Sequence, residues 1–289
     1  MKKINGLRFI IGTACNYDCF YCHHEGCYSE SCNSDLIDYE NKIKLLYEFC
    51  IKNEIYEIAI TGGEPFLYFD KLSILFKYFS NSKFHVIVNT NASLIHKYAD
   101  FINNLPCKLE FHVNLSSLKP MVHKEITRTK LFYDEIKSLK MIDTTKHIIK
   151  LNIICLKSLN DNELIELNTF ATTNNYIPRY LVFYDSNNTY SNLIMSVDDI
   201  CNVFGARVYK RFSYGIYLAK GDANIEIIKC LCADRECEIC KLNTYLHIDP
   251  ELNIKYCLNL NETVKINYKD INSASKAFAN ACIKLEEIV

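Results

Sequence analysis

Cysteine is the residue type most able to do chemistry in this chain, because it is abundant and clustered. The 289 residues include 15 cysteines, an odd number that cannot be fully paired within one chain. The chain is also far longer than the small secreted domains that disulfides stabilise. Two groups of closely spaced cysteines lie near the two ends of the chain, and metal ligation explains them better than disulfides do.

The first group is a CxxxCxxC motif formed by Cys15, Cys19 and Cys22. Thiolates with this spacing on a tight loop can converge on one metal centre. A structural zinc site usually takes four ligands, so three thiolates are an unusual set for it. In a [4Fe–4S] cluster they leave one iron without a protein ligand, and that iron can bind a substrate or cofactor. A zinc knuckle is the alternative that the spacing leaves open.

Polar and glycine residues at the ends of later strand-like segments fit the same chemistry. The segment 57–61 is followed by Gly62, Gly63 and Glu64, and glycines at a strand end let the backbone approach a ligand closely. Asn91 and Ser116 also follow strand-like segments, where α/β folds place their ligands. Turn formation and helix capping are the alternative roles for Asn91 and Ser116.

The order of these motifs resembles the radical SAM superfamily. In that family the three cysteines hold a [4Fe–4S] cluster whose open iron binds S-adenosylmethionine, and an aromatic residue stands at the position of Tyr21. The cofactor is cleaved to methionine and a 5′-deoxyadenosyl radical, which abstracts hydrogen from the substrate. The resemblance implies catalytic ligands at Cys15, Cys19 and Cys22, and cofactor contacts at Tyr21, Gly62, Gly63, Glu64, Asn91 and Ser116.

Arg128 is a further candidate for the cofactor site. It belongs to a basic stretch with Lys119, Lys124 and Lys130. A solvated helix flank is the alternative explanation of that stretch.

The second cysteine group comprises Cys230, Cys232, Cys237 and Cys240, and Cys257 follows after a hairpin-like segment. The pattern predicts an auxiliary [4Fe–4S] cluster, with a four-thiolate zinc site as the alternative. Three ligands, Cys237, Cys240 and Cys257, would leave an open iron, whereas Cys230 or Cys232 as a fourth ligand would close the cluster. Spacing does not decide between the two.

The whole layout is similar to the GTP 3′,8-cyclase family of molybdenum-cofactor biosynthesis. Arg8, Asn152 and Arg179 match substrate-contact positions of that family. A closed auxiliary cluster would instead resemble twitch and SPASM-type radical SAM enzymes. The family also implies an electron donor of the flavodoxin or ferredoxin type.

Two departures from the cyclase family lead us to expect a substrate other than GTP. Tyr68 stands in place of an arginine that follows the GGEP segment, and Tyr245–Ile248 replaces an arginine-containing strand. A triphosphate needs guanidinium partners, which Tyr and His replace poorly. We therefore expect a radical SAM enzyme acting on a small molecule or peptide. A GTP 3′,8-cyclase and a non-enzymatic zinc or iron–sulfur module are the alternatives.

Alternating β-rich and helical segments must position these residues. Up to about residue 185 the alternation predicts an α/β fold with a parallel sheet. The resemblance implies a partial (β/α)6 TIM-like barrel over residues 1–190. Strands are expected at 7–12, 57–61, 84–89, 109–115, 148–156 and 180–184, and helices at 40–49, 70–79, 94–102, 133–141 and 162–172.

The pattern changes after a polar, turn-rich stretch at 185–192. We expect a small α+β auxiliary-cluster domain over residues 191–289, stabilised by its metal because it is too short to bury much core. Its expected elements are a helix at 197–212, strands at 216–219, 224–228, 245–248 and 254–257, and a helix from about 273.

Composition restricts the partners. The formal net charge is −1 and the pI is about 6.7, which argues against a general polyanion-binding surface and against a nucleic acid polymer as partner. The sequence contains no run of roughly 20 apolar residues, as a membrane span requires, and no secretory signal at its start. A cytoplasmic location and no membrane partner are therefore expected.

Overall fold

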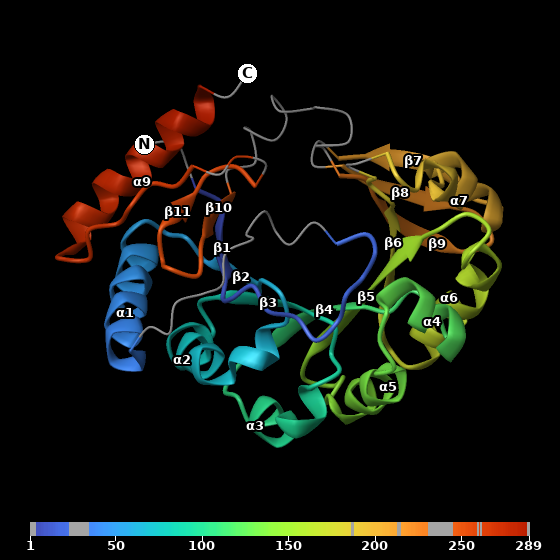
Figure 1. Cartoon of the computed structure of the whole chain (residues 1–289), viewed down its shortest axis with the longest axis horizontal. Helices are drawn as coiled ribbons and strands as arrows, with labels where there is room; N and C mark the ends of the chain where they lie inside the picture. Colours follow the sequence, from blue (N-terminus) through green and yellow to red (C-terminus); the bar gives the residue numbers. More distant parts are fainter. Residues whose placement is uncertain are drawn as a thin grey trace.

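The fold is built on one curved, mostly parallel β-sheet (Figure 1). The structure is a computed structural model that describes residues 4–22, 35–185, 188–212, 215–230, 245–258, 260 and 262–287. Six parallel strands form its centre: β1 Gly6–Ile10, β2 Glu57–Thr61, β3 His85–Thr90, β4 Leu109–Asn114, β5 Ile148–Cys155 and β6 Ile177–Val182. The predicted α/β class is confirmed.

Helices cover the convex side of this sheet (Figure 1). They are α1 Leu36–Lys52, α2 Phe69–Phe79, α3 Ala99–Asn103, α4 Pro120–Thr127, α5 Phe132–Met141 and α6 Leu164–Thr173. Short 3-10 turns precede several of them: η2 Pro65–Tyr68, η3 Ile95–Lys97 and η4 Asp161–Glu163. Alternate strand residues such as Leu7 and Phe9 are buried in the core beneath the helices.

The residues between those core positions face the other way. We call this opposite side of the sheet the concave face. Arg8, between Leu7 and Phe9, lies on it, as does Arg179, which precedes the fully buried core residue Tyr180. The concave face is therefore much more polar than the convex one.

The C-terminal strands continue the same sheet at both edges. Strand β10 (Tyr245–Ile248) pairs in parallel with β1, and β9 (Asn224–Ile228) pairs in parallel with β6. The complete order among the described residues is β11-β10-β1-β2-β3-β4-β5-β6-β9-β8-β7. The outer strands are β7 Arg207–Arg211, β8 Ile216–Lys220 and β11 Ile254–Lys255. The boundary near residue 190 stays a prediction, but strands on both sides of it share one sheet.

Two C-terminal helices complete the described elements. Helix α7 (Val197–Val203) follows the 3-10 turn η5 (Ser191–Leu193), and α9 (Ile271–Glu286) packs beside α1 (Figure 1). Phe278 of α9 stacks on Phe49 of α1 with ring centroids 4.1 Å apart. No helix in the described part of the chain is long and apolar enough to cross a bilayer.

Some predicted elements were wrong. The expected helix at 197–212 ends at Val203, because Gly205 takes a left-handed conformation (φ 52°) and the chain then forms β7. Strand β6 begins at Ile177, earlier than expected. Helix α4 was not predicted, although Pro120 at its first turn is a helix-start signal.

Candidate functional site

The segment that carries the first three cysteines follows β1 directly. We call residues 11–22 the cysteine loop; Figure 1 shows it in blue, running across the concave side of the sheet. Its backbone is fastened to the end of α4, because Asp18 N–H donates to the Thr127 carbonyl (3.1 Å) and Phe20 N–H donates to the Ile126 carbonyl (3.3 Å). The loop is thus held from the side as well as by β1.

The three thiols of the cysteine loop lie close enough to affect one another electrostatically. Burial raises the pKa of Cys15 to about 11 and that of Cys19 to about 12, and the charge of Cys22 adds to both shifts. No three His, Cys, Asp or Glu side chains in the described ranges are grouped to hold a single metal ion. Three soft thiolate donors on one short loop fit an iron–sulfur cluster.

Two glycines after β2 lie directly against the cysteine loop. Gly63 N–H donates to the Gly12 carbonyl (2.9 Å), and Glu64 N–H donates to the Ala14 carbonyl (3.0 Å). A Cβ on Gly63 would lie 2.0 Å from the Ala14 oxygen, and Gly62 has φ +138°, so neither position tolerates a side chain. The predicted glycines thus allow close contact between the β2 end and the cysteine loop.

Glu64 joins the ends of β2 and β3. Its buried carboxylate accepts hydrogen bonds from the N–H groups of Phe66 (3.0 Å) and Asn91 (2.8 Å) and from the Thr90 hydroxyl (2.7 Å). Burial raises the pKa of Glu64 to about 7, although these hydrogen bonds oppose the shift. The side chain therefore orders the strand ends.

Asn91 connects that arrangement to the cysteine loop. Its Nδ2 donates to Asn16 Oδ1 (2.8 Å) and lies 3.8 Å from Cys15 Sγ. Ser93 completes the group, donating to Asn91 Oδ1 (2.7 Å) and accepting from Asn16 Nδ2 (2.8 Å). Asn16 and Ser93 were not predicted as site residues. The signal that could have identified Asn16 is its amide side chain, which lies between the first two cysteines of the motif.

Ser116 and Tyr21 meet through Asn114 at the end of β4. Ser116 Oγ accepts from Ile154 N–H (3.0 Å) and donates to Asn114 Oδ1 (3.2 Å), while Asn114 Nδ2 donates to the Tyr21 hydroxyl. Tyr21, Asn91 and Ser116 thus come from the cysteine loop, the β3 end and the β4 end to one side of the sheet. Ser116 thus joins the ends of β4 and β5, and its contact with the cofactor stays a prediction.

Tyr68 and Arg128 contact the cysteine loop in different ways. The Tyr68 hydroxyl accepts from Ala14 N–H (2.7 Å), so the residue that replaces a family arginine supports the loop that carries the cysteines. Arg128 is half exposed and pairs with Asp18 at 3.3 Å. Its contact with the cofactor stays a prediction.

A buried polar network that we did not predict lies behind the cysteine loop. Tyr17 donates to Glu135 Oε2 (2.9 Å), and His123 Nε2 lies 3.0 Å from the same oxygen. Glu135 is fully buried, and its Oε1 has no hydrogen-bond partner among the described residues. Burial raises the pKa of Glu135, while His123 opposes that rise. Helices α4 and α5 thereby hold the loop through side chains.

The three predicted substrate residues all lie on the concave face. Arg8 stands beside His247 in the β1–β10 register, and Asn152 pairs in register with Arg179. Asn152 Oδ1 and His247 Nδ1 are buried without a hydrogen-bond partner in the described part of the chain. Burial lowers the pKa of His247 to about 3, and the positive charge of Arg8 adds to this shift. Buried polar atoms that lack partners indicate a place where a ligand binds.

A charged group adjoins those residues. Glu110 accepts from Lys150 (2.8 Å) and His112 (2.6 Å), and also contacts His85 (3.2 Å). Burial favours the neutral acid, but these partners hold the pKa of Glu110 well below its usual range. Hydrogen bonds to Glu110 and Glu57 raise the pKa of His85 to about 9. The concave face thus carries the cations Lys150 and Arg179 in addition to Arg8.

The second cysteine group is only partly described. Cys230 is exposed and Cys257 is half-buried. The remaining predicted ligands, Cys232, Cys237 and Cys240, lie outside the described residues. The auxiliary cluster and its ligand set stay predictions.

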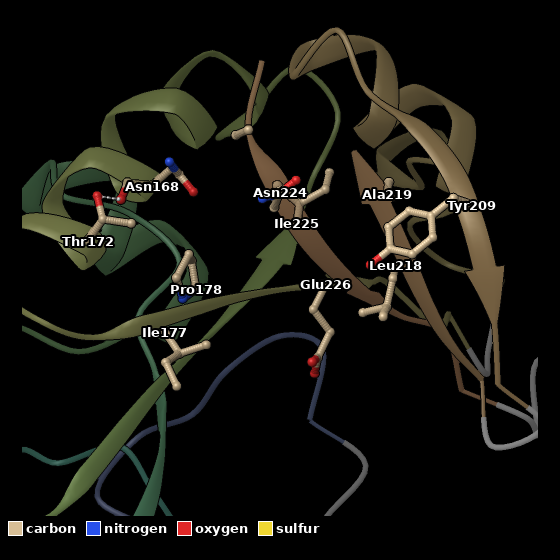
Figure 2. A pocket seen from close by; sticks show the side chains of 11 residues that line it. Asn168, Thr172, Ile177, Pro178, Tyr209, Leu218, Ala219, Asn224, Ile225 and Glu226 are labelled. Atoms are coloured by element: carbon tan, nitrogen blue, oxygen red, sulfur yellow. Dashed lines mark hydrogen bonds between the residues drawn. The ribbon is translucent and has the colours of Figure 1, made fainter. Parts of the chain in front are cut away.

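Two cavities differ in their relation to the cysteine loop. One of about 50 Å³ adjoins Cys22 and is lined by aromatic side chains such as Phe20 and Tyr190. Another, of about 350 Å³, lies between α6 and strands β6 to β9 (Figure 2). Figure 2 shows Asn168 on one side of it and Tyr209 on the other. None of the residues named above as contacting the cysteine loop lines the larger cavity.

The class of protein follows from the fold and the site together. A family model of the radical SAM superfamily matches residues 9–171. The chain belongs to the radical SAM superfamily and is a radical SAM enzyme. That family uses a [4Fe–4S] cluster and S-adenosylmethionine, and the donor set of the cysteine loop fits the cluster.

The curated proteins that the chain resembles share one activity within this superfamily. A GTP 3′,8-cyclase from Campylobacter jejuni is 32% identical over 228 residues, which are 76% of this chain and 67% of the relative. A GTP 3′,8-cyclase from Nautilia profundicola is 26% identical, covering 65% of this chain and 59% of the relative.

Solved structures support the fold. Streptococcus suis SuiB bound to precursor peptide SuiA has a TM-score of 0.67 at 16% identity and covers 95% of this chain, which spans 65% of SuiB. The structure of anSMEcpe with bound AdoMet has a TM-score of 0.61 at 16% identity, covering 97% of this chain and 82% of that one. The predicted partial TIM-like barrel is confirmed.

The expectation of a substrate other than GTP was wrong. Several curated GTP 3′,8-cyclases at 26–32% identity contradict it. The expectation rested on missing arginines at Tyr68 and Tyr245–Ile248. Those two positions alone do not determine the charge of the concave face, because Lys150 and Arg179 come from other strands.

Proposed function

We propose that this protein is a GTP 3′,8-cyclase, which binds GTP on the concave face of the sheet near the cysteine loop. The observation that carries the proposal is the 32% identity to a GTP 3′,8-cyclase over most of both chains. The concave face supports it, because it combines guanidinium and ammonium groups with buried polar atoms that have no hydrogen-bond partner among the described residues.

The cysteine loop would hold the catalytic cluster. When bound, the cluster supplies the electron that cleaves S-adenosylmethionine to methionine and a 5′-deoxyadenosyl radical. Cys15, Cys19 and Cys22 would ligate three irons. Cofactor contacts are proposed at Tyr21, Gly62, Gly63, Glu64, Asn91, Ser116 and Arg128, of which most lie at strand ends beside the cysteine loop.

The protein's own part in this reaction is positioning. Glu64 and Asn91 keep the β2 and β3 ends in contact with the cysteine loop. Arg8, Asn152 and Arg179 would bind the nucleotide opposite the cofactor. The fixed arrangement aims one carbon of the cofactor at one hydrogen of the substrate.

The C-terminal cysteines would provide a second, auxiliary cluster of the twitch or SPASM type. Cys237, Cys240 and Cys257 are its proposed ligands. Cys230 or Cys232 as a fourth ligand would close the cluster, and without one it would keep an open iron. An electron donor of the flavodoxin or ferredoxin type would reduce the catalytic cluster.

Anaerobic reconstitution followed by an activity assay tests this function. We expect about eight irons per chain, and GTP-dependent formation of both 5′-deoxyadenosine and a nucleotide joined between C3′ and C8. The Cys15→Ala variant should lose about four irons and all 5′-deoxyadenosine formation. Cleavage of S-adenosylmethionine without any change in GTP would contradict the proposal.

A further inference from the structure

His112 occupies an unusual place on the concave face, between an acid and an arginine from different strands. His112 and Glu110 belong to β4, Arg179 belongs to β6, and β5 lies between these strands. Contact across an intervening strand is possible because all three side chains point to the concave side. The core residues on either side of His112, Phe111 and Val113, are fully buried on the convex side.

The hydrogen bonds determine how the imidazole is protonated. His112 Nε2 lies 2.6 Å from Glu110 Oε1, a carboxylate oxygen that accepts, so Nε2 carries the hydrogen. Arg179 Nη1 lies 3.1 Å from Nδ1 and 3.2 Å from Nε2 of the same ring. Nη1 is thus almost equally far from both ring nitrogens, which places it over the face of the imidazole, where a cation is attracted by the π electrons of a neutral ring.

A neutral ring suits this position. Burial lowers the pKa of His112 to about 4, and the positive charge of Arg179 adds to the shift although Glu110 opposes it. An imidazolium at this place would present a second cation to the guanidinium at hydrogen-bond distance. The neutral imidazole instead offers its π face to Arg179 and adds no charge of its own.

Arg179 is held from a second side. Its Nε donates to Glu226 of β9 at 2.9 Å. With Nε bound to Glu226 and Nη1 bound to His112, the plane of the guanidinium is fixed, and Nη2 makes no hydrogen bond to the described residues. A planar cation fixed in this way presents its remaining donors in one direction.

We propose that His112 is a positioning residue that directs the Arg179 guanidinium at the phosphate groups of the nucleotide substrate. The inference rests on the proposed GTP 3′,8-cyclase function. His112 does not itself touch the substrate. It acts through Arg179, and the neutral ring preserves the positive charge that a phosphate requires.

Calorimetric titration of the anaerobically reconstituted protein with GTP and with guanosine tests this role. Removing the imidazole in His112→Leu should weaken GTP binding by about tenfold and leave guanosine binding unchanged, because only GTP carries the phosphates. His112→Gln should bind GTP like the wild type, since a carboxamide can donate to Glu110 and accept from Arg179. His85→Leu is the matched control, because His85 contacts Glu110 but not Arg179.

A double-variant cycle distinguishes positioning from a general structural effect. If His112 acts through Arg179, then His112→Leu adds little to the loss already caused by Arg179→Lys. Should His112→Leu fail to fold, His112→Asn replaces it, since its short amide cannot reach both partners and should show the same selective loss for GTP.

The outcomes separate the inference from the proposed function. A wild-type protein that does not bind GTP would overturn the proposed function. Wild-type GTP binding with equal losses for GTP and guanosine, with no loss in His112→Leu or His112→Asn, or with additive losses in the double variant, would overturn the role of His112 alone.

Discussion

At the scale of single residues, the buried carboxyl group of Glu64 is the clearest feature of the site. Glu64 is a carboxyl group buried away from water, yet three donors converge on it from the ends of β2 and β3. Such a group is costly to bury, so its hydrogen bonds and its ionisation affect stability together.

Replacing Glu64 should change how stability depends on pH. The pKa of Glu64 is about 7 in the folded protein, whereas its ordinary value is 4.5, so between these pH values the folded state holds a proton that the unfolded state has lost. The free energy of unfolding should therefore fall as pH rises from 4.5 to 7. Relative to Glu64→Gln, the decline should be on the order of 3 kcal/mol.

Urea unfolding at several pH values, at matched cluster content, measures this difference. Other titrating groups are the same in both proteins and cancel in the comparison. Parallel stability curves for the wild type and Glu64→Gln would show that the folded-state pKa is not raised.

Much of the site could be predicted at the scale of residues, because cysteine spacing and strand-end polar residues are local signals. Glu64 and Asn91 were predicted in this way, and the structure places both beside the cysteine loop or its neighbours. Tyr17, Glu135 and His112 were not found. Their roles arise from partners distant in the sequence, and no local pattern marks a buried tyrosine or histidine as part of a network.

At the scale of elements, α4 and α5 matter because they hold the cysteine loop. The end of α4 accepts backbone hydrogen bonds from the loop, and Glu135 of α5 accepts one from the Tyr17 side chain. The loop is therefore fixed by backbone and side-chain contacts from two helices that provide no cysteine.

Tyr17→Phe should loosen this attachment. It removes one of the two donors to a carboxylate that is fully buried, at a cost of about 1–3 kcal/mol in unfolding free energy. Iron should also be lost to a chelator faster than from the wild type. Thermal unfolding and the rate of iron release measure the two effects.

Tyr133→Phe is the control for this prediction. Tyr133 lies on the same helix, α5, and is 72% exposed, so its hydroxyl should not matter. Equal iron release from both variants would mean that the Tyr17 hydroxyl does not hold the loop.

Element boundaries show where sequence patterns fail. The apolar periodicity that suggested a helix at 197–212 continues past Gly205, but the left-handed conformation of that glycine ends the helix. Helix α4 is only 8 residues long, too short for its amphipathic pattern to stand out.

For the whole molecule, the important feature is that the C-terminal region completes the sheet and covers α1. Phe278 of α9 is fully buried and stacks on Phe49 of α1. The packing of the helix that follows the cysteine loop thus depends on the last helix of the chain.

Phe278→Ala should test that dependence. Removing a fully buried ring that stacks at 4.1 Å should lower the unfolding free energy by about 3–5 kcal/mol. Urea unfolding measures the loss. Ile283→Ala on the same helix is the control, since that side chain is 59% exposed and should cost much less. Equal losses would show that α9 is not anchored by Phe278.

The sheet order could not be predicted from sequence. Alternation of strands and helices predicts parallel neighbours for β1 to β6, but the pairing of β10 with β1 joins residues at opposite ends of the chain. Nothing local in Tyr245–Ile248 specifies its partner.

That pairing has a consequence for synthesis. Because β2 follows β1 closely in the sequence whereas residue 245 is synthesised much later, β1 has a neighbour on only one side until β10 leaves the ribosome. The strand that leads into the first three cysteines is therefore an unprotected sheet edge in the nascent chain until β10 covers it.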